Sequence, residues 1–161
     1  MTVVMVFVLI AVVLFVAAFL SRRRFGLLGL ALTAGATLSS IWSYDAGLLI
    51  SALGILPSGP TTNAVALSAV VLLPAALLLF HGYVYKTRLG RVIGATLFTL
   101  LALAFLVEPL EYTLPLTGDA AMIFAFIKDQ KDLIISFGVV AAVTDIFFTK
   151  PVRNDKDKRR H

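Results

Sequence analysis

The chain has 161 residues, of which 60% are hydrophobic, and it carries a formal charge of +5 at pH 7. This composition is too apolar for a soluble domain of that length, so it predicts an integral membrane protein with a single helical domain. The absence of cysteine excludes disulfides, thiol catalysis and iron–sulfur clusters. The cations lie in short clusters beside apolar runs, which is typical of membrane flanks and argues against nucleic-acid binding.

The first predicted span is the apolar run at residues 2–20, which is long enough to cross a bilayer at about 1.5 Å per residue. No cation precedes this run, whereas Arg22, Arg23 and Arg24 follow it. A cleaved signal peptide has the opposite arrangement, with cations before its apolar core. We therefore expect the segment to be retained, with the N-terminus outside the cell and the arginine cluster on the cytoplasmic side.

The second predicted span covers residues 25–42 and carries small residues at three- and four-residue spacing. These residues share one helical face, where a second backbone can approach closely. The stripe predicts a helix-packing face, and a substrate path is the alternative interpretation. Its members are Gly26, Gly29, Thr33, Ala36 and Ser40.

Residues 43–63 contain no lysine or arginine and include a proline and glycine cluster at 57–60, so we expect an outer loop. The apolar stretch at 46–56 inside this loop is too short to cross a membrane. It is predicted to lie in the membrane interface as a short helix, and a re-entrant pore loop is the alternative.

A membrane hairpin occupies the middle of the chain. Its first arm, the third predicted span, covers residues 64–83 and contains Pro74, where we expect a kink. His81, Tyr83 and Tyr85 follow at the inner interface, and His81 is interpreted as an interfacial side chain rather than a ligand. We expect the turn of the hairpin on the cytoplasmic side, since it carries a second basic cluster. This cluster consists of Lys86, Arg88 and Arg91.

The fourth predicted span, residues 89–107, opens with a G-x-x-x-G step made by Gly90 and Gly94. In a membrane helix this step is typical of close contact with another helix. We expect Gly94 to meet Gly29 of the second span, because glycine lets two backbones approach.

Residues 108–119 are predicted to form an outer loop, because they include three acids, two prolines and no cation. Residues 120–127 are apolar but too short to cross a membrane, and the charged residues 128–132 follow them. We interpret 120–127 as an outer interfacial helix and 133–149 as the fifth span. A chain with four spans and an outer amphipathic helix is the alternative.

Asp145 is the one acid predicted within a span, and it shares a helical face with Gly138 and Ala142. An intramembrane carboxylate is a candidate for ion coupling. Asp145 lies about one turn from the end of its span, however, where snorkelling or pairing with Lys150 would lower the cost of its charge.

The polar tail at residues 150–161 holds the third basic cluster and is predicted to be a disordered cytoplasmic segment that contacts anionic headgroups. Of the 14 lysines and arginines, only Lys128 and Lys131 lie outside the three clusters. Five spans place all three clusters on one side of the membrane. We therefore predict an all-α integral membrane protein, a bundle of five transmembrane helices with short interfacial helices in one domain of residues 1–149. Its C-terminus is expected in the cytoplasm.

Two short motifs resemble those of the colicin V production protein (CvpA) family of small bacterial inner-membrane proteins, and the resemblance covers residues 22–132. Residues 23–26 loosely match the arginine-rich junction of that family, with glycine opening the second span. Arg91 and Gly94 match an Asp-Arg-x-x-Gly signature at the start of its last core span, although Gly90 stands in place of the acid.

The resemblance implies a non-enzymatic role in envelope maintenance or in the export of secreted peptides. Separately, no sequence motif here joins a nucleophile to a base, forms a metal cluster or brings acids together, so we expect neither an enzyme nor a cofactor. We predict an accessory or assembly subunit that forms a homo-oligomer or binds other membrane proteins. A small oligomeric transporter or channel subunit, with Asp145 as its coupling acid, is the alternative.

Overall fold

The computed structural model describes residues 2–43, 45–54, 57, 59–80, 85, 87–111 and 119–148. The regular elements within these residues are six α-helices, in agreement with the predicted all-α fold. They are α1 (Thr2–Ser21), α2 (Phe25–Ile41), α3 (Asp45–Ala52), α4 (Pro60–Phe80), α5 (Arg88–Glu111) and α6 (Asp119–Phe147). The predictions for His81, Lys86 and the tail at 150–161 concern residues outside this part of the chain.

Among the residues that the structure describes, two helices, α4 and α5, are long and apolar enough to cross a membrane, which indicates a membrane protein. Helices α2 and α3 together add a third such segment if the bent pair is one span. Helix α1, whose side chains are described from Met5 to Ser21, is apolar but shorter over this stretch. Length and composition therefore support two or three crossings, and the bundle of five spans stays a prediction.

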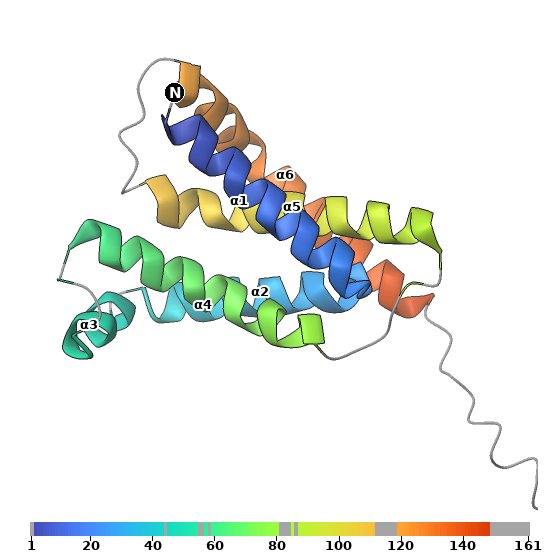
Figure 1. Cartoon of the computed structure of the whole chain (residues 1–161), viewed down its shortest axis with the longest axis horizontal. Helices are drawn as coiled ribbons and strands as arrows, with labels where there is room; N and C mark the ends of the chain where they lie inside the picture. The colour runs from blue at the N-terminus through green and yellow to red at the C-terminus, as the bar shows by residue number, and fades with distance from the viewer. Residues whose placement is uncertain are drawn as a thin grey trace, which may run out of the picture.

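The helices form two groups, which contact each other through α5 and α6. Helices α2 and α4 lie side by side, and α1 crosses α5 (Figure 1). Helix α6 packs against both α2 and α5. The short helix α3 packs on α4, with its axis at 84° to that of α2, and it overlaps the apolar stretch predicted to form a short helix.

The core lies where α2, α4, α5 and α6 meet. Phe25, Leu28 and Leu32 of α2 and Phe98 and Leu101 of α5 are each at most 2% exposed. Helices this apolar carry no polar face that would distinguish inside from outside. Their orientation therefore depends on where small residues allow close contact.

One such contact joins α2 to α4 at Gly35. A Cβ atom at this position would lie 2.2 Å from the carbonyl oxygen of Val71 and 2.8 Å from its carbonyl carbon. Because these are backbone atoms, no side-chain rotation could make room for a methyl group. The small-residue stripe predicted from the sequence did not include Gly35. Gly35 contacts α4, whereas Gly26 and Gly29 of the stripe contact α6.

Helix α5 extends past the predicted end at residue 107 and ends at Glu111, with Pro109 in its last turn. Proline lacks the N–H group that would bond to the Phe105 carbonyl and its ring crowds that carbonyl, yet the helix continues for only two residues beyond it. Glu108 and Glu111, which we predicted in an outer loop, therefore stand on a helix one turn apart.

Helix α6 is continuous from Asp119 to Phe147, so the predicted break at residues 128–132 is wrong. The two lysines of this segment bond to Glu111 and Glu108 of α5, which satisfies their charge without ending the helix. Lysine and glutamine are also good helix formers. The interfacial helix and the fifth span of the prediction are thus two halves of one element.

Replacing Gly35 by alanine should destabilise the protein by about 1–3 kcal/mol, because the added methyl group forces α2 and α4 apart. Thermal unfolding in mild detergent would measure the loss. Gly59→Ala is the matched control, since a Cβ at Gly59 would meet no heavy atom within 4 Å. Equal melting temperatures for the two variants would contradict the close contact.

Candidate functional site

The start of α2 is held by groups from two other elements. The Gly26 N–H donates to Oδ2 of Asp145 on α6 at 2.9 Å, and the Phe25 N–H donates to the hydroxyl of Tyr85 at 3.2 Å. The Tyr85 hydroxyl in turn donates to Asp145 Oδ2 at 3.2 Å. The first N–H groups of a helix have no partner within the helix, and the Arg24 side chain at the N-cap does not cap them. Asp145 and Tyr85 therefore cap α2 together.

The end of the bundle where this cap lies is called the basic end here, because Arg23 and Arg91 also lie there. Arg23 donates from Nε to the Leu79 carbonyl at 3.1 Å and from Nη2 to the Phe80 carbonyl at 2.6 Å, at the end of α4. Arg91 donates to the Phe19 carbonyl near the end of α1 at 3.0 Å. A cation at a helix C-terminus also interacts favourably with the helix dipole.

Tyr85 is the residue through which these contacts meet. Its N–H donates to the Arg22 carbonyl at 2.8 Å, and the Arg24 guanidinium lies 5.6 Å from the centre of its ring. Arg22 itself has a φ of 57°, a left-handed conformation that costs a non-glycine residue free energy. The Tyr85 N–H thus supplies a hydrogen-bond partner for the carbonyl of Arg22, the residue that follows the end of α1.

The two glycines of the G-x-x-x-G step lie against the Tyr85 ring. A Cβ at Gly94 would be 2.6 Å from Tyr85 Cε2, and one at Gly90 would be 3.0 Å from Tyr85 Cδ1. Gly29 lies elsewhere, against α6. A Cβ at Gly29 would be 2.9 Å from the Cβ of Ala142. The predicted contact between Gly29 and Gly94 is therefore wrong, because each glycine makes room for a different neighbour.

Gly26 and Gly29 bring α2 and α6 together at the basic end. A Cβ at Gly26 would lie 2.6 Å from the Ala142 carbonyl oxygen and 3.1 Å from Asp145 Oδ2. The close approach is therefore also what allows the Asp145 carboxylate to reach the first turn of α2. This half of the predicted stripe is a packing face, with α6 as its partner.

Burial raises the pKa of Tyr85 above its ordinary value, and the nearby Asp145 carboxylate raises the pKa further. The Phe25 N–H, which donates to the hydroxyl, lowers the pKa. The net result is a phenol that stays protonated at neutral pH and so keeps its hydrogen for Asp145.

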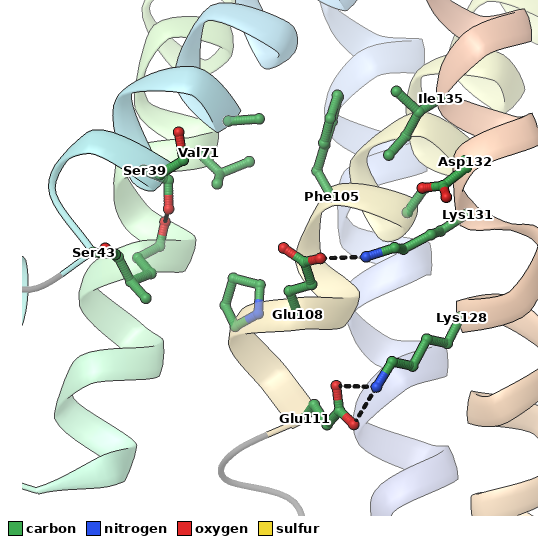
Figure 2. A pocket seen from close by; sticks show the side chains of 15 residues that line it. Ser39, Ser43, Val71, Phe105, Glu108, Glu111, Lys128, Lys131, Asp132 and Ile135 are labelled. Atoms are coloured by element: carbon green, nitrogen blue, oxygen red, sulfur yellow. Dashed lines mark hydrogen bonds and ion pairs between the residues drawn. The ribbon is translucent and has the colours of Figure 1, made fainter.

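At the opposite end of the bundle, α2 and α4 are separated from α5 and α6 by a cleft of about 640 Å³. Figure 2 shows two ion pairs along one wall, Lys128 with Glu111 and Lys131 with Glu108. Lys128 Nζ lies 2.6 Å and 2.8 Å from the two Glu111 carboxylate oxygens. The end of the bundle that holds this cleft is called the cleft end.

The other wall of the cleft comes from the second half of the small-residue stripe and its neighbours. Ala36, Ser39, Ser40 and Ser43 line it. The stripe thus has two roles, helix packing at the basic end and a cleft wall at the cleft end. The alternative interpretation of the stripe, a path for a ligand, concerns this second half only.

Neither the role of Tyr85 at the basic end nor the two ion pairs at the cleft end was predicted from the sequence. Tyr85 was assigned only to the interface, and the ion pairs were not predicted, because Glu108 and Glu111 were assigned to a loop. The spacing that could have revealed the pairs is the matching three-residue separation of Glu108 from Glu111 and of Lys128 from Lys131. On antiparallel helices this spacing allows two ion pairs, one turn apart.

No known family model, curated protein or solved structure matches the chain. The resemblance to the CvpA family therefore stays a prediction from residues 22–132. Within the residues described, no group of three histidine, aspartate or glutamate side chains could hold a metal ion.

Asp145→Ala should destabilise the protein by about 1–2 kcal/mol, since it removes the acceptor for the α2 cap. Asp145→Asn should cost less than about half of that, because an amide oxygen is also a good helix cap. Chemical unfolding in detergent at neutral pH measures both. Equal losses in the two variants would show that the charge, and not the hydrogen bond, holds α2.

The pH dependence of stability should show how much the protonated Tyr85 hydroxyl contributes to the free energy of unfolding. A tyrosine whose folded pKa lies above its unfolded value of about 10 stabilises the fold fully below pH 10, and this stability is lost as the pH rises through the folded pKa. We expect the wild type to exceed Tyr85→Phe by about 1–2 kcal/mol at neutral pH, a difference that shrinks above about pH 10. Unfolding of both proteins across this range tests it, and a constant difference would refute it.

Proposed function

We propose that the protein is a non-enzymatic membrane protein with five spans that acts as an accessory or assembly subunit. The observation that carries the proposal is the hydrogen bonding of Asp145 to Gly26 and Tyr85. This carboxylate is the acid that a coupling role would require, and here it holds the start of α2. A group that fixes one helix onto another serves packing, which is what an assembly subunit needs.

The proposed topology has the basic end in the cytoplasm and the cleft end outside. Arg23 and Arg91 belong to two different basic clusters, and their hydrogen bonds to the ends of α4 and α1 bring both to one end of the bundle. This grouping supports a common cytoplasmic side for them. The proposal extends to a bacterial inner membrane through the resemblance to the CvpA family.

A second candidate is a small oligomeric transporter or channel subunit, which the cleft favours. It opens at the cleft end and is lined by charged side chains of both signs. In this function Asp145 would have to release and bind a proton or an ion during the cycle. Its hydrogen bonds to α2 would then have to break in every cycle.

The topology is tested by reporter fusions after residues 58, 87, 117 and 161. We expect periplasmic activity at 58 and 117 and cytoplasmic activity at 87 and 161, since the basic clusters stay inside. A periplasmic C-terminus would contradict five spans and favour four.

Reconstituted vesicles distinguish the two functions. We expect the wild type to carry no pH-dependent flux of ions. We also expect a partner protein to copurify with the wild type in mild detergent, as identified by mass spectrometry, and to copurify equally with Asp145→Asn. A flux that is present in the wild type and lost in Asp145→Asn, at unchanged stability, would overturn the accessory role. Asp129→Asn, a change of an exposed acid on the same helix that does not line the cleft, is the matched control.

A further inference from the structure

The cleft between α2 and α6 has an apolar part and a charged part. Val71, Phe105 and Ile135 line it towards the middle of the bundle, and the ion pairs lie beyond them towards the cleft end (Figure 2). Its volume of about 640 Å³ falls in the range of small-molecule sites, about 300–1,000 Å³. The lining therefore suits a ligand with an apolar chain and a charged head.

The charged part offers both signs side by side. The two ion pairs, Glu108 with Lys131 and Glu111 with Lys128, are one helical turn apart, about 4.5 Å along the axis. An ammonium group has three donors and a carboxylate accepts at two oxygens, so Lys131 can hold Glu108 and a second anion at once. The Glu108 side chain is 65% exposed and can likewise accept from an added cation.

The depth of the charged part follows from the length of α5. This helix has 24 residues, which at about 1.5 Å each reach beyond a hydrocarbon core of about 30 Å. If α5 crosses the membrane, Glu111 in its last turn reaches the headgroup layer at the cleft end, with Glu108 one turn below it. The apolar part of the cleft would then lie at the depth of the acyl chains.

We propose that the cleft binds one phospholipid with a zwitterionic ethanolamine headgroup from the outer leaflet. The lipid phosphate accepts from Lys131, and the primary ammonium donates to Glu108 and Glu111. One acyl chain lies along Phe105 and its apolar neighbours. The proposal rests on the proposed topology, in which α5 crosses the membrane with the cleft end outside, but it does not depend on the accessory role.

The headgroup chemistry predicts a selectivity. A choline headgroup carries the same charges but has no N–H to donate to the carboxylates, so it should bind less tightly. A glycerol headgroup has the phosphate and no cation, which leaves the glutamates facing an added negative charge. The ethanolamine lipid alone satisfies both members of the ion pairs.

The test is a titration of delipidated protein in mild detergent with short-chain phosphatidylethanolamine, phosphatidylcholine and phosphatidylglycerol. Native mass spectrometry counts the bound lipid, and the fluorescence of Trp42, beside the cleft residue Ser43, gives the affinity. We expect one ethanolamine lipid per chain, bound at least about tenfold more tightly than the other two. Equal affinities for all three lipids would overturn the proposal.

Two variants assign the contacts. Lys131→Gln should weaken the ethanolamine lipid at least about tenfold, because a phosphate partner is lost. Glu108→Gln releases Lys131 from its ion pair, so it should remove most of the preference for ethanolamine and tighten the binding of phosphatidylglycerol. Arg88→Gln, an exposed cation at the basic end, is the control and should change nothing. Unchanged lipid affinities in Glu108→Gln would contradict the site even if Lys131→Gln fails to fold.

Discussion

The structure depends on how the first N–H groups of α2 are satisfied. Such groups have no partner in their own helix, and in an apolar surrounding each unpaired one costs several kcal/mol. A polar N-cap side chain is the usual solution, but Arg24 makes no such bond. Asp145 and Tyr85 supply the acceptors instead, and in doing so they fix α2 to α6 and to the segment before α5.

The same principle operates at the helix ends around it. Arg23 satisfies the last carbonyls of α4, and Arg91 satisfies a carbonyl near the end of α1. Charged residues that the sequence marks as topology signals thus also connect helices that are distant in the chain. The basic end is held by these bonds and by the small residues of α2, whereas the cleft end is joined across α5 and α6 by ion pairs.

The existence and type of the helices could be predicted from the sequence, because long apolar runs bounded by charge or proline have few alternatives. The ends of α2 agree with the prediction within one residue, and its glycines do lie in close contacts. The identity of each contact could not be predicted. A G-x-x-x-G step shows only that something lies near, and here that neighbour is the ring of Tyr85, a residue whose local sequence carries no pattern.

The continuous α6 could not be predicted for a related reason. Residues 128–132 resemble a solvated break when read alone, and only the partner acids on α5 make them compatible with a helix that packs in the bundle. Those acids had been assigned to a loop, since Pro109 stands between them. Each error therefore came from a tertiary contact that compensates for a local signal.

The central claim is that Tyr85 and Asp145 act as one cap for α2, and a double-mutant cycle tests it most directly. Free energies of unfolding are measured in mild detergent for the wild type, Tyr85→Phe, Asp145→Ala and the double variant. Because both groups bond to each other and to the first turn of α2, the losses should be non-additive by about 0.5–3 kcal/mol, with the double variant less destabilised than the sum. Losses that add within about 0.3 kcal/mol would show two independent residues and contradict the account.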